Sequence, residues 1–197
     1  MIRLPALQRF ICAALFSAAV LPTVASCAEP DELTTATQRF LGLFPASEML
    51  ALNQKMVLQI AVNMGSKVRP EFVKCMNAAI EPSVFDDASL KLAKRNFKDV
   101  QRLKEINEFM QSAAGIKYRR HALKVMETGL KQLEAGEAIR DAKPAAFTAE
   151  EMGVIQAFGA RPSYAEFSRF SADVQQELRA DDLQDDKLWK IRVRCDS

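Results

Sequence analysis

Apolar residues recur every three or four positions along most of the chain, which is the period of one face of an α-helix. Three long stripes show this spacing most clearly: Met49, Leu52, Met56, Ile60 and Met64; Leu90, Ala93, Phe97, Val100, Leu103, Ile106 and Met110; and Ile116, Leu123, Met126, Leu130 and Leu133. The composition agrees, because helix-favouring residues dominate and only 7 Gly and 8 Pro interrupt them. We therefore expect an all-α fold, a bundle of about six or seven helices.

Prolines and capping residues set the expected helix ends. Pro45 and Pro82 interrupt the pattern early in the chain. The stripe from Leu90 to Met110 predicts one long helix. Thr148, followed three residues later by Glu151, predicts a capping box at the start of a further helix.

The last residues follow a different pattern. From Trp189 to Cys195 apolar and basic residues alternate, and this period of two predicts an extended tail with one buried face. We expect the tail to lie over the helices as a clasp. The second interpretation is an interaction surface that faces lipid headgroups or a protein partner. This surface would consist of Lys187, Trp189, Lys190, Arg192 and Arg194.

The N-terminus has the pattern of a secretory signal peptide. Arg3 and Arg9 precede an uncharged apolar run, Phe10 to Leu21, and small residues follow. A run of about 12 apolar residues is too short to span a bilayer about 30 Å thick. We expect a signal peptide over residues 1–27 and a single helical domain over residues 28–197.

Two cleavage sites fit the small residues after the apolar run. Val24-Ala25-Ser26-Cys27 resembles a bacterial lipobox, in which Cys27 becomes the lipidated first residue. A cut after Ala28 fits an ordinary signal peptidase equally well. Both alternatives place the mature protein outside the cytoplasm, in the periplasm or at the outer membrane.

The cysteines predict a disulfide. Cys12 leaves with the signal peptide, and Cys27 is either lipidated or removed. Cys75 and Cys195 then remain as an even pair in an oxidising compartment, where a disulfide is the default. A catalytic or metal-binding cysteine would need a companion, but His121 is the only histidine and no CxxC motif occurs.

Charge gives no reason to expect a nucleic-acid ligand. The full chain has 27 basic and 25 acidic side chains. Arg3 and Arg9 are the only charges before either cut, so removing them leaves 25 basic and 25 acidic side chains. The mature protein therefore has no net charge. Only a local cluster of basic residues could attract an anionic ligand.

An internal repeat is suggested by two segments that align without gaps at an offset of 49. These are Leu103–Arg120 and Met152–Arg169, each with the pattern of a helix end, a tight turn and a new helix. Ile106 matches Ile155, Phe109 matches Phe158, Tyr118 matches Phe167, and Arg120 matches Arg169. A duplicated helical hairpin and two hairpins that converged on one pattern both explain the match.

A family resemblance lies in the same region. FTAEEMGVIQAF (Phe147–Phe158), followed by Pro162 and an aromatic-rich helix, resembles the signature of domain-of-unknown-function family 2059. The earlier hairpin supplies Ser112, Gly115 and Lys117 at the turn of that signature. Members are secreted or periplasmic proteobacterial proteins. The resemblance implies a helical bundle outside the cytoplasm and brings no known active site.

No motif predicts catalysis, a cofactor or a metal site. The helical period places His121 opposite the apolar stripe of its helix, facing solvent. Arg119 falls on the apolar face, either extending to solvent at the start of the helix or anchoring an anion in a pocket. Adjacent acidic pairs such as Asp86–Asp87 and Glu150–Glu151 fit helix starts better than facing catalytic carboxylates.

These observations favour an exported, non-enzymatic envelope protein that acts through contacts with a protein partner. Two alternatives are a carrier that parts its helices around an apolar ligand and an immunity protein against a periplasmic toxin. A membrane attachment through a lipid on Cys27 is compatible with each of them.

Overall fold

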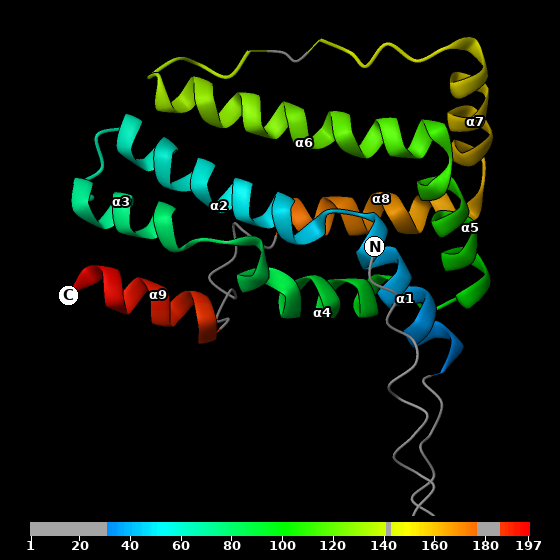
Figure 1. The fold of residues 1–197 in the computed structure, drawn as a ribbon, viewed down its shortest axis with the longest axis horizontal. Coiled ribbons are helices and arrows are strands. Elements are labelled where there is room, and N and C mark those ends of the chain that lie inside the picture. Colours follow the sequence, from blue (N-terminus) through cyan, green and yellow to red (C-terminus); the bar gives the residue numbers. More distant parts are fainter. Residues whose placement is uncertain (1–30, 141–142, 177–185) are drawn as a thin grey trace, which may run out of the picture.

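The computed structural model describes residues 31–140, 143–176 and 186–197 (Figure 1). In these ranges the chain forms nine α-helices, one 3-10 helix and no strand, so the all-α prediction is confirmed. The elements are α1 (Glu32–Leu43), α2 (Ala46–Asn63), α3 (Pro70–Ala79), η1 (Pro82–Phe85), α4 (Asp86–Asn96), α5 (Val100–Gln111), α6 (Ala113–Glu134), α7 (Ala149–Gly159), α8 (Pro162–Gln176) and α9 (Asp186–Asp196).

The helices stack in rows. α6 lies along α2, α8 runs through the middle against α2, α4 and α5, and α1 packs on α5 (Figure 1). The segment from Gly136 to Phe147 runs back along the length of α6 to reach α7, apart from its two undescribed residues (Figure 1). α9 contacts α3 at the edge of the molecule that lies farthest from α6 in Figure 1.

A cluster of aromatic rings fills the centre. Phe40 lies 4.8 Å from Phe97 and 5.1 Å from Phe170, measured between ring centroids, and both contacts are edge-to-face or nearly so. Phe44 and Phe167 extend the cluster with centroids 5.5 Å apart. All five side chains are buried. Because burial of such a side chain contributes about 1.5–3 kcal/mol, this cluster is a main source of stability.

Two helical hairpins have matching boundaries. α5 begins at Val100 and α7 begins 49 residues later at Ala149; α6 begins at Ala113 and α8 begins 49 residues later at Pro162. The N-terminal caps match as well. Asp99 accepts hydrogen bonds from the first turn of α5, and Thr148, at the same offset, caps α7 in the capping box that the sequence predicts.

Equivalent residues of the two hairpins also contact each other. Phe109 stacks on Phe158, with ring centroids 4.1 Å apart and an angle of 7° between the planes. Tyr118 lies 6.2 Å from its counterpart Phe167. The contacts within each hairpin are nearly equal, 6.4 Å for Phe109–Tyr118 and 6.1 Å for Phe158–Phe167. The four rings therefore have an approximate two-fold arrangement.

Two ion pairs repeat this relationship with opposite polarity. Arg102 of α5 pairs with Glu166 of α8 at 2.6 Å, and Glu151 of α7 pairs with Lys117 of α6 at 2.7 Å. Arg102 and Glu151 are equivalent positions at the offset of 49, and so are Lys117 and Glu166. At both places the α5–α6 hairpin supplies the basic residue and the α7–α8 hairpin supplies the acidic one. The charges at equivalent positions are therefore opposite.

The predicted long helix over Leu90–Met110 is wrong, because α4 ends at Asn96 and α5 begins at Val100. Asp99 caps α5 with its side chain, accepting from the N–H groups of Gln101 and Arg102. The apolar stripe continues without a change of spacing from α4 into α5. For this reason the sequence pattern does not show that Asp99 starts a new helix. This division and the final helix explain why the described residues contain nine helices and not the expected six or seven.

The predicted extended tail is also wrong, because residues 186–196 form the helix α9. Leu188, Ile191 and Cys195 follow the helical spacing and face the bundle, whereas Trp189 and Val193 are exposed. Ile191 and Cys195 fit both patterns, because they belong to the alternation of apolar and basic residues and also to the helical spacing that starts at Leu188.

The predicted disulfide joins Cys75 of α3 to Cys195 of α9, with Cα atoms 5.6 Å apart. Two ion pairs also attach α9 to the rest of the molecule: Arg69–Asp196 at 2.9 Å and Lys187–Asp87 at 3.1 Å. The signal peptide, both cleavage sites and Cys27 lie outside the described residues.

Candidate functional site

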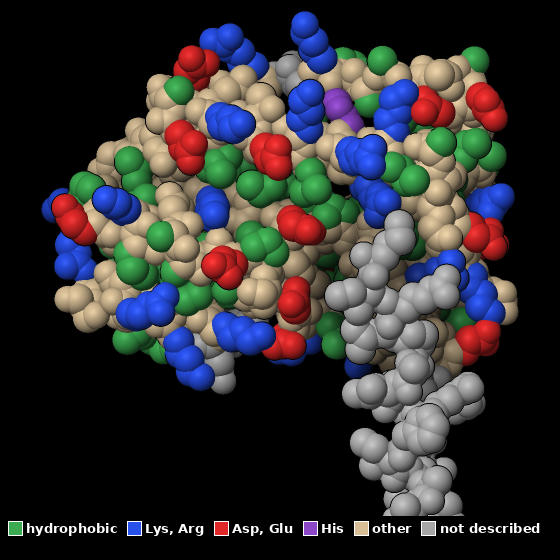
Figure 2. Space-filling view, in the orientation of Figure 1, with side chains coloured by type: hydrophobic (Ala, Val, Ile, Leu, Met, Phe, Trp, Pro, Cys, Tyr) green, Lys and Arg blue, Asp and Glu red, His purple; other side chains and the backbone are tan. Residues whose placement is uncertain are grey.

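The outer face of α9 carries the surface that the sequence singles out. Trp189 has 59% of its surface exposed and Val193 has 50%, and the two lie one helical turn apart. Lys190, Arg192 and Arg194 are exposed around them. Figure 2 shows basic side chains along the lower left edge of the molecule, where α9 lies in Figure 1. The result is an apolar strip with basic borders.

The helix holds this strip in a fixed position. The disulfide and the Arg69–Asp196 pair secure its C-terminal end, and Lys187 pairs with Asp87 near its N-terminal end. Of the five predicted surface residues, Lys187 thus has a structural role, whereas Trp189 and the other three present their side chains to solvent.

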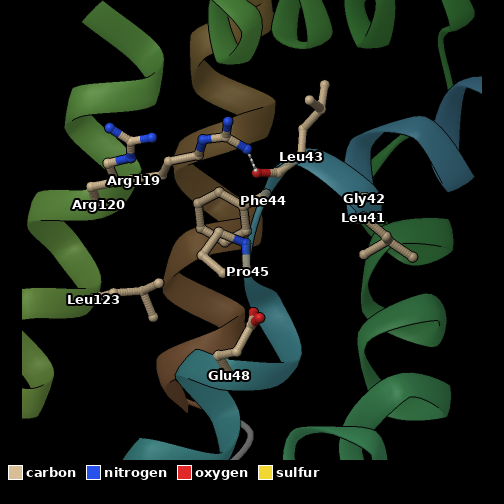
Figure 3. Close-up of a pocket in the computed structure, with 9 residues that line it drawn as sticks. All are labelled: Leu41, Gly42, Leu43, Phe44, Pro45, Glu48, Arg119, Arg120 and Leu123. Carbon is tan, nitrogen blue, oxygen red and sulfur yellow. Dashed lines mark hydrogen bonds between the residues drawn. The ribbon is translucent and has the colours of Figure 1, made fainter. Parts of the chain in front are cut away.

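Arg119 lines a cavity of about 270 Å³ between α6 and the turn that joins α1 to α2 (Figure 3). Its guanidinium donates a hydrogen bond to the carbonyl oxygen of Leu43. Arg120, also from α6, and Glu48, from α2, contribute opposite charges to the rim. The Arg119 side chain is therefore half-buried on the apolar side, as the sequence predicts, and it holds the α1–α2 turn in place through a backbone oxygen.

The prediction for His121 is confirmed in part: the side chain lies on the surface of the molecule (Figure 2), but it is half-buried. It lines a groove between α6 and the segment of residues 136–147. The helical period correctly places His121 opposite the main stripe, and the returning segment adds a second wall on that face. A segment without periodicity gives no sequence signal that it will pack there.

Basic side chains surround the histidine on this face of the molecule (Figure 2). The N-terminal half of α6 contributes most of them, in the sequence KYRRHALK from Lys117 to Lys124. Lys117 is neutralised by Glu151, and its ammonium lies 5.4 Å from the centre of the Phe147 ring. Sequence reasoning considered Arg119 and His121 singly and missed this basic surface, although the density of charge was visible.

Shifted pKa values occur at structural contacts. The Lys117 ammonium, together with the Thr148 N–H, lowers the pKa of Glu151. Hydrogen bonds from Asn96 and then Arg95 lower the pKa of Asp173. Burial raises the pKa of Tyr118. In the described parts of the chain these groups form no arrangement of nucleophile and base, and no group of His, Cys, Asp and Glu is placed to hold a metal ion.

Comparison with known proteins adds no assignment: no family model, curated protein or solved structure matches the chain. The resemblance to family 2059 therefore stays a prediction. Among the described helices, none is long and apolar enough to cross a membrane.

Proposed function

We propose that the chain is an exported cell-envelope protein, periplasmic or anchored to the outer membrane by a lipid on Cys27. It acts without catalysis, by binding another envelope protein through α9. The observation that carries this proposal is the exposed Trp189–Val193 strip, bordered by Lys190, Arg192 and Arg194 and held in place by the disulfide.

The composition of this surface suits a protein interface. Tryptophan and arginine are the residues most enriched at the energetic centres of interfaces, where they fill pockets and exclude water. An exposed tryptophan on a helix with fixed ends loses little conformational freedom on binding. The three basic side chains around it have no ion pair among the described residues, and they favour a partner with an acidic surface.

A carrier would require a rearrangement of this fold that binding at α9 does not. A carrier that parts its helices would have to open the ring cluster around Phe40, which is completely buried. Binding at α9 requires no rearrangement. Immunity against a periplasmic toxin would be the same kind of contact with one particular partner.

Site-specific photocrosslinking tests the proposal. A photoreactive residue in place of Lys190 should yield one main adduct in intact cells, and Trp189→Ala should abolish it. The same residue in place of Lys131, an exposed position on α6, is the matched control and should not give this adduct. With the partner purified, Trp189→Ala should weaken binding about 30-fold, as expected for a central interface residue. Identical adducts from both positions, or adducts unaffected by Trp189→Ala, would contradict a role for α9.

The mass of the mature protein tests export and anchoring separately. A chain that begins at a lipid-modified Cys27 supports the lipoprotein, and one that begins at Glu29 supports the soluble form. A chain that retains Arg3 and Arg9 would contradict the signal peptide.

A further inference from the structure

The groove that contains His121 has two walls, and both carry apolar and basic side chains. α6 contributes His121, Lys124, Val125, Thr128, Gly129 and Gln132; the returning segment contributes Ile139, Arg140, Lys143, Pro144, Ala145 and Ala146. Its volume is about 550 Å³, within the range of about 300–1,000 Å³ that is typical of small-molecule sites. Each wall thus supplies both apolar and basic side chains.

Three contacts fix how the walls face each other. Phe147 lies by Lys117, Ile139 lies by Gly129, and the N–H of Arg140 donates to the side chain of Gln132 at 3.1 Å. The segment therefore runs antiparallel to α6. Lys143 consequently lies toward the half of α6 that carries His121 and Lys124, and the Gly129–Ile139 contact lies further along the groove. One end of the groove is basic and its middle is apolar.

Among the described residues, no acidic side chain of the groove neutralises the charges of its basic end. None of the described lining residues is acidic, and among the described residues neither Lys124 nor Lys143 has an ion pair. Arg140, toward the other end, pairs with Glu137 at 3.0 Å. An apolar floor beside two cations that have no acidic partner in the described part of the chain favours a ligand that combines an apolar chain with a negative charge.

We infer that this groove binds a single-chain amphiphilic anion, with its acidic head at Lys124 and Lys143 and its chain along Val125, Gly129 and Ile139. A free fatty acid and a lysophospholipid share this chemistry. The site is independent of α9, so it adds a ligand to the proposed function and does not rest on it.

Calorimetric titration of the mature protein tests the inference, with each lipid kept below its micelle concentration. Dodecanoate should bind at least about tenfold more tightly than dodecanol, which has the same chain and no charge. Lysophosphatidylglycerol set against dodecanoate distinguishes the two sources of the anion, and either one binding in this way supports the site. Higher salt should weaken the binding.

Two variants locate the ligand. Lys124→Glu/Lys143→Glu reverses the head-group charges, and Ala145→Trp fills the groove from the exposed segment; each should weaken binding at least about tenfold. Lys91→Glu/Lys131→Glu, with the same change of net charge at exposed positions outside the groove, is the control and should bind as the unmodified protein does. Thermal unfolding should show that all variants remain folded.

Equal affinity for dodecanoate and dodecanol, no binding of either anion, or equal losses in the groove variants and the control would overturn the inference. So would binding of an acidic peptide in the absence of binding by the acyl anions. The crosslinking at α9 does not depend on any of these results, so the failure of one proposal is distinguishable from the failure of the other.

Discussion

Phe109 and Phe158 occupy equivalent positions of the two hairpins and stack on each other, with ring centroids 4.1 Å apart. The same offset of 49 relates the helix starts and the two ion pairs of opposite polarity. Agreement in boundaries, caps and contacts favours a duplicated hairpin over convergence, because amphipathic helices need share only their period. The interface between the hairpins resembles that of a two-fold homodimer joined into one chain.

Removing the stacked pair tests how strongly the hairpins are coupled. Phe109→Leu and Phe158→Leu should each lower the free energy of unfolding by about 0.5–3 kcal/mol. The double variant should lose less than the sum, with a coupling of about 0.5–1.5 kcal/mol, because each single change already removes the stacking. Urea denaturation followed by circular dichroism measures all three.

Phe97→Leu combined with Phe158→Leu is the control for this cycle. Phe97 packs on Phe40 and Phe170, and no ring contact with Phe158 is found among the described residues. These two changes should therefore be additive within about 0.5 kcal/mol. Additivity in the Phe109–Phe158 cycle would show that the stacking contributes no stability.

Reversal of an ion pair tests the symmetry directly. Arg102→Glu should lower the melting temperature, because it leaves Glu166, whose side chain is only 7% exposed, facing a like charge. Arg102→Glu/Glu166→Lys should recover most of the loss, since the equivalent positions Glu151 and Lys117 already hold this polarity. A double variant as unstable as Arg102→Glu alone would show that the two places are not interchangeable.

Acid stability should depend on Glu151. Its pKa in the folded protein is lowered below the ordinary 4.5 by Lys117 and Thr148. It therefore stabilises the fold above the unfolded pKa, and this contribution is lost as the pH falls through the folded pKa. Glu151→Gln retains a side chain that can complete the capping box but carries no charge. Between pH 7 and pH 3 this variant should lose less stability than the unmodified protein, as measured by urea midpoints.

The remaining dependence in the Glu151→Gln variant should include Asp173, whose pKa is lowered by Asn96 and Arg95. Equal pH dependence in the variant and the unmodified protein would contradict the role of Glu151.

Two helical glycines should respond oppositely to alanine. A Cβ at Gly115 would lie 2.0 Å from the carbonyl oxygen of Phe109, so Gly115→Ala must displace the backbone where α5 meets α6. We expect it to cost about 2 kcal/mol or more. Gly153 in α7 has nothing within 4 Å of the same position, and Gly153→Ala should stabilise the protein by about 0.5–1 kcal/mol. Thermal and urea unfolding measure both, and similar effects at the two sites would contradict the close approach at Gly115.

The sequence predicts the features that depend on neighbouring residues. The capping box of Thr148 and Glu151 and the apolar stripe from Ala93 to Met110 are local patterns, and the structure confirms them. The stripe from Met49 to Met64 is only partly confirmed, because Met49 lies in the core whereas Ile60 and Met64 are exposed. The Cys75–Cys195 disulfide is predicted by the even number of cysteines that remain and the compartment, and the structure confirms it as well.

The features that sequence reasoning missed depend on contacts between distant segments. In the last eleven residues two periods compete, and only packing of Ile191 and Cys195 against the bundle decides for the helix. The groove at His121 depends on where residues 136–147 return. The path of a segment without helical or strand period is set by the helices it must connect, so the pattern along α6 could not reveal it.

The bond between Cys75 and Cys195 also has a consequence for proteolysis. Cys75 and Cys195 lie 120 residues apart, so the bond encloses more than half of the chain. A single cleavage of any peptide bond between these two cysteines leaves both fragments in one covalent molecule, and α9 stays attached to α3. A nicked protein would therefore migrate as an intact one until its disulfide is reduced, and a protease would need two cuts to release a piece of the enclosed chain.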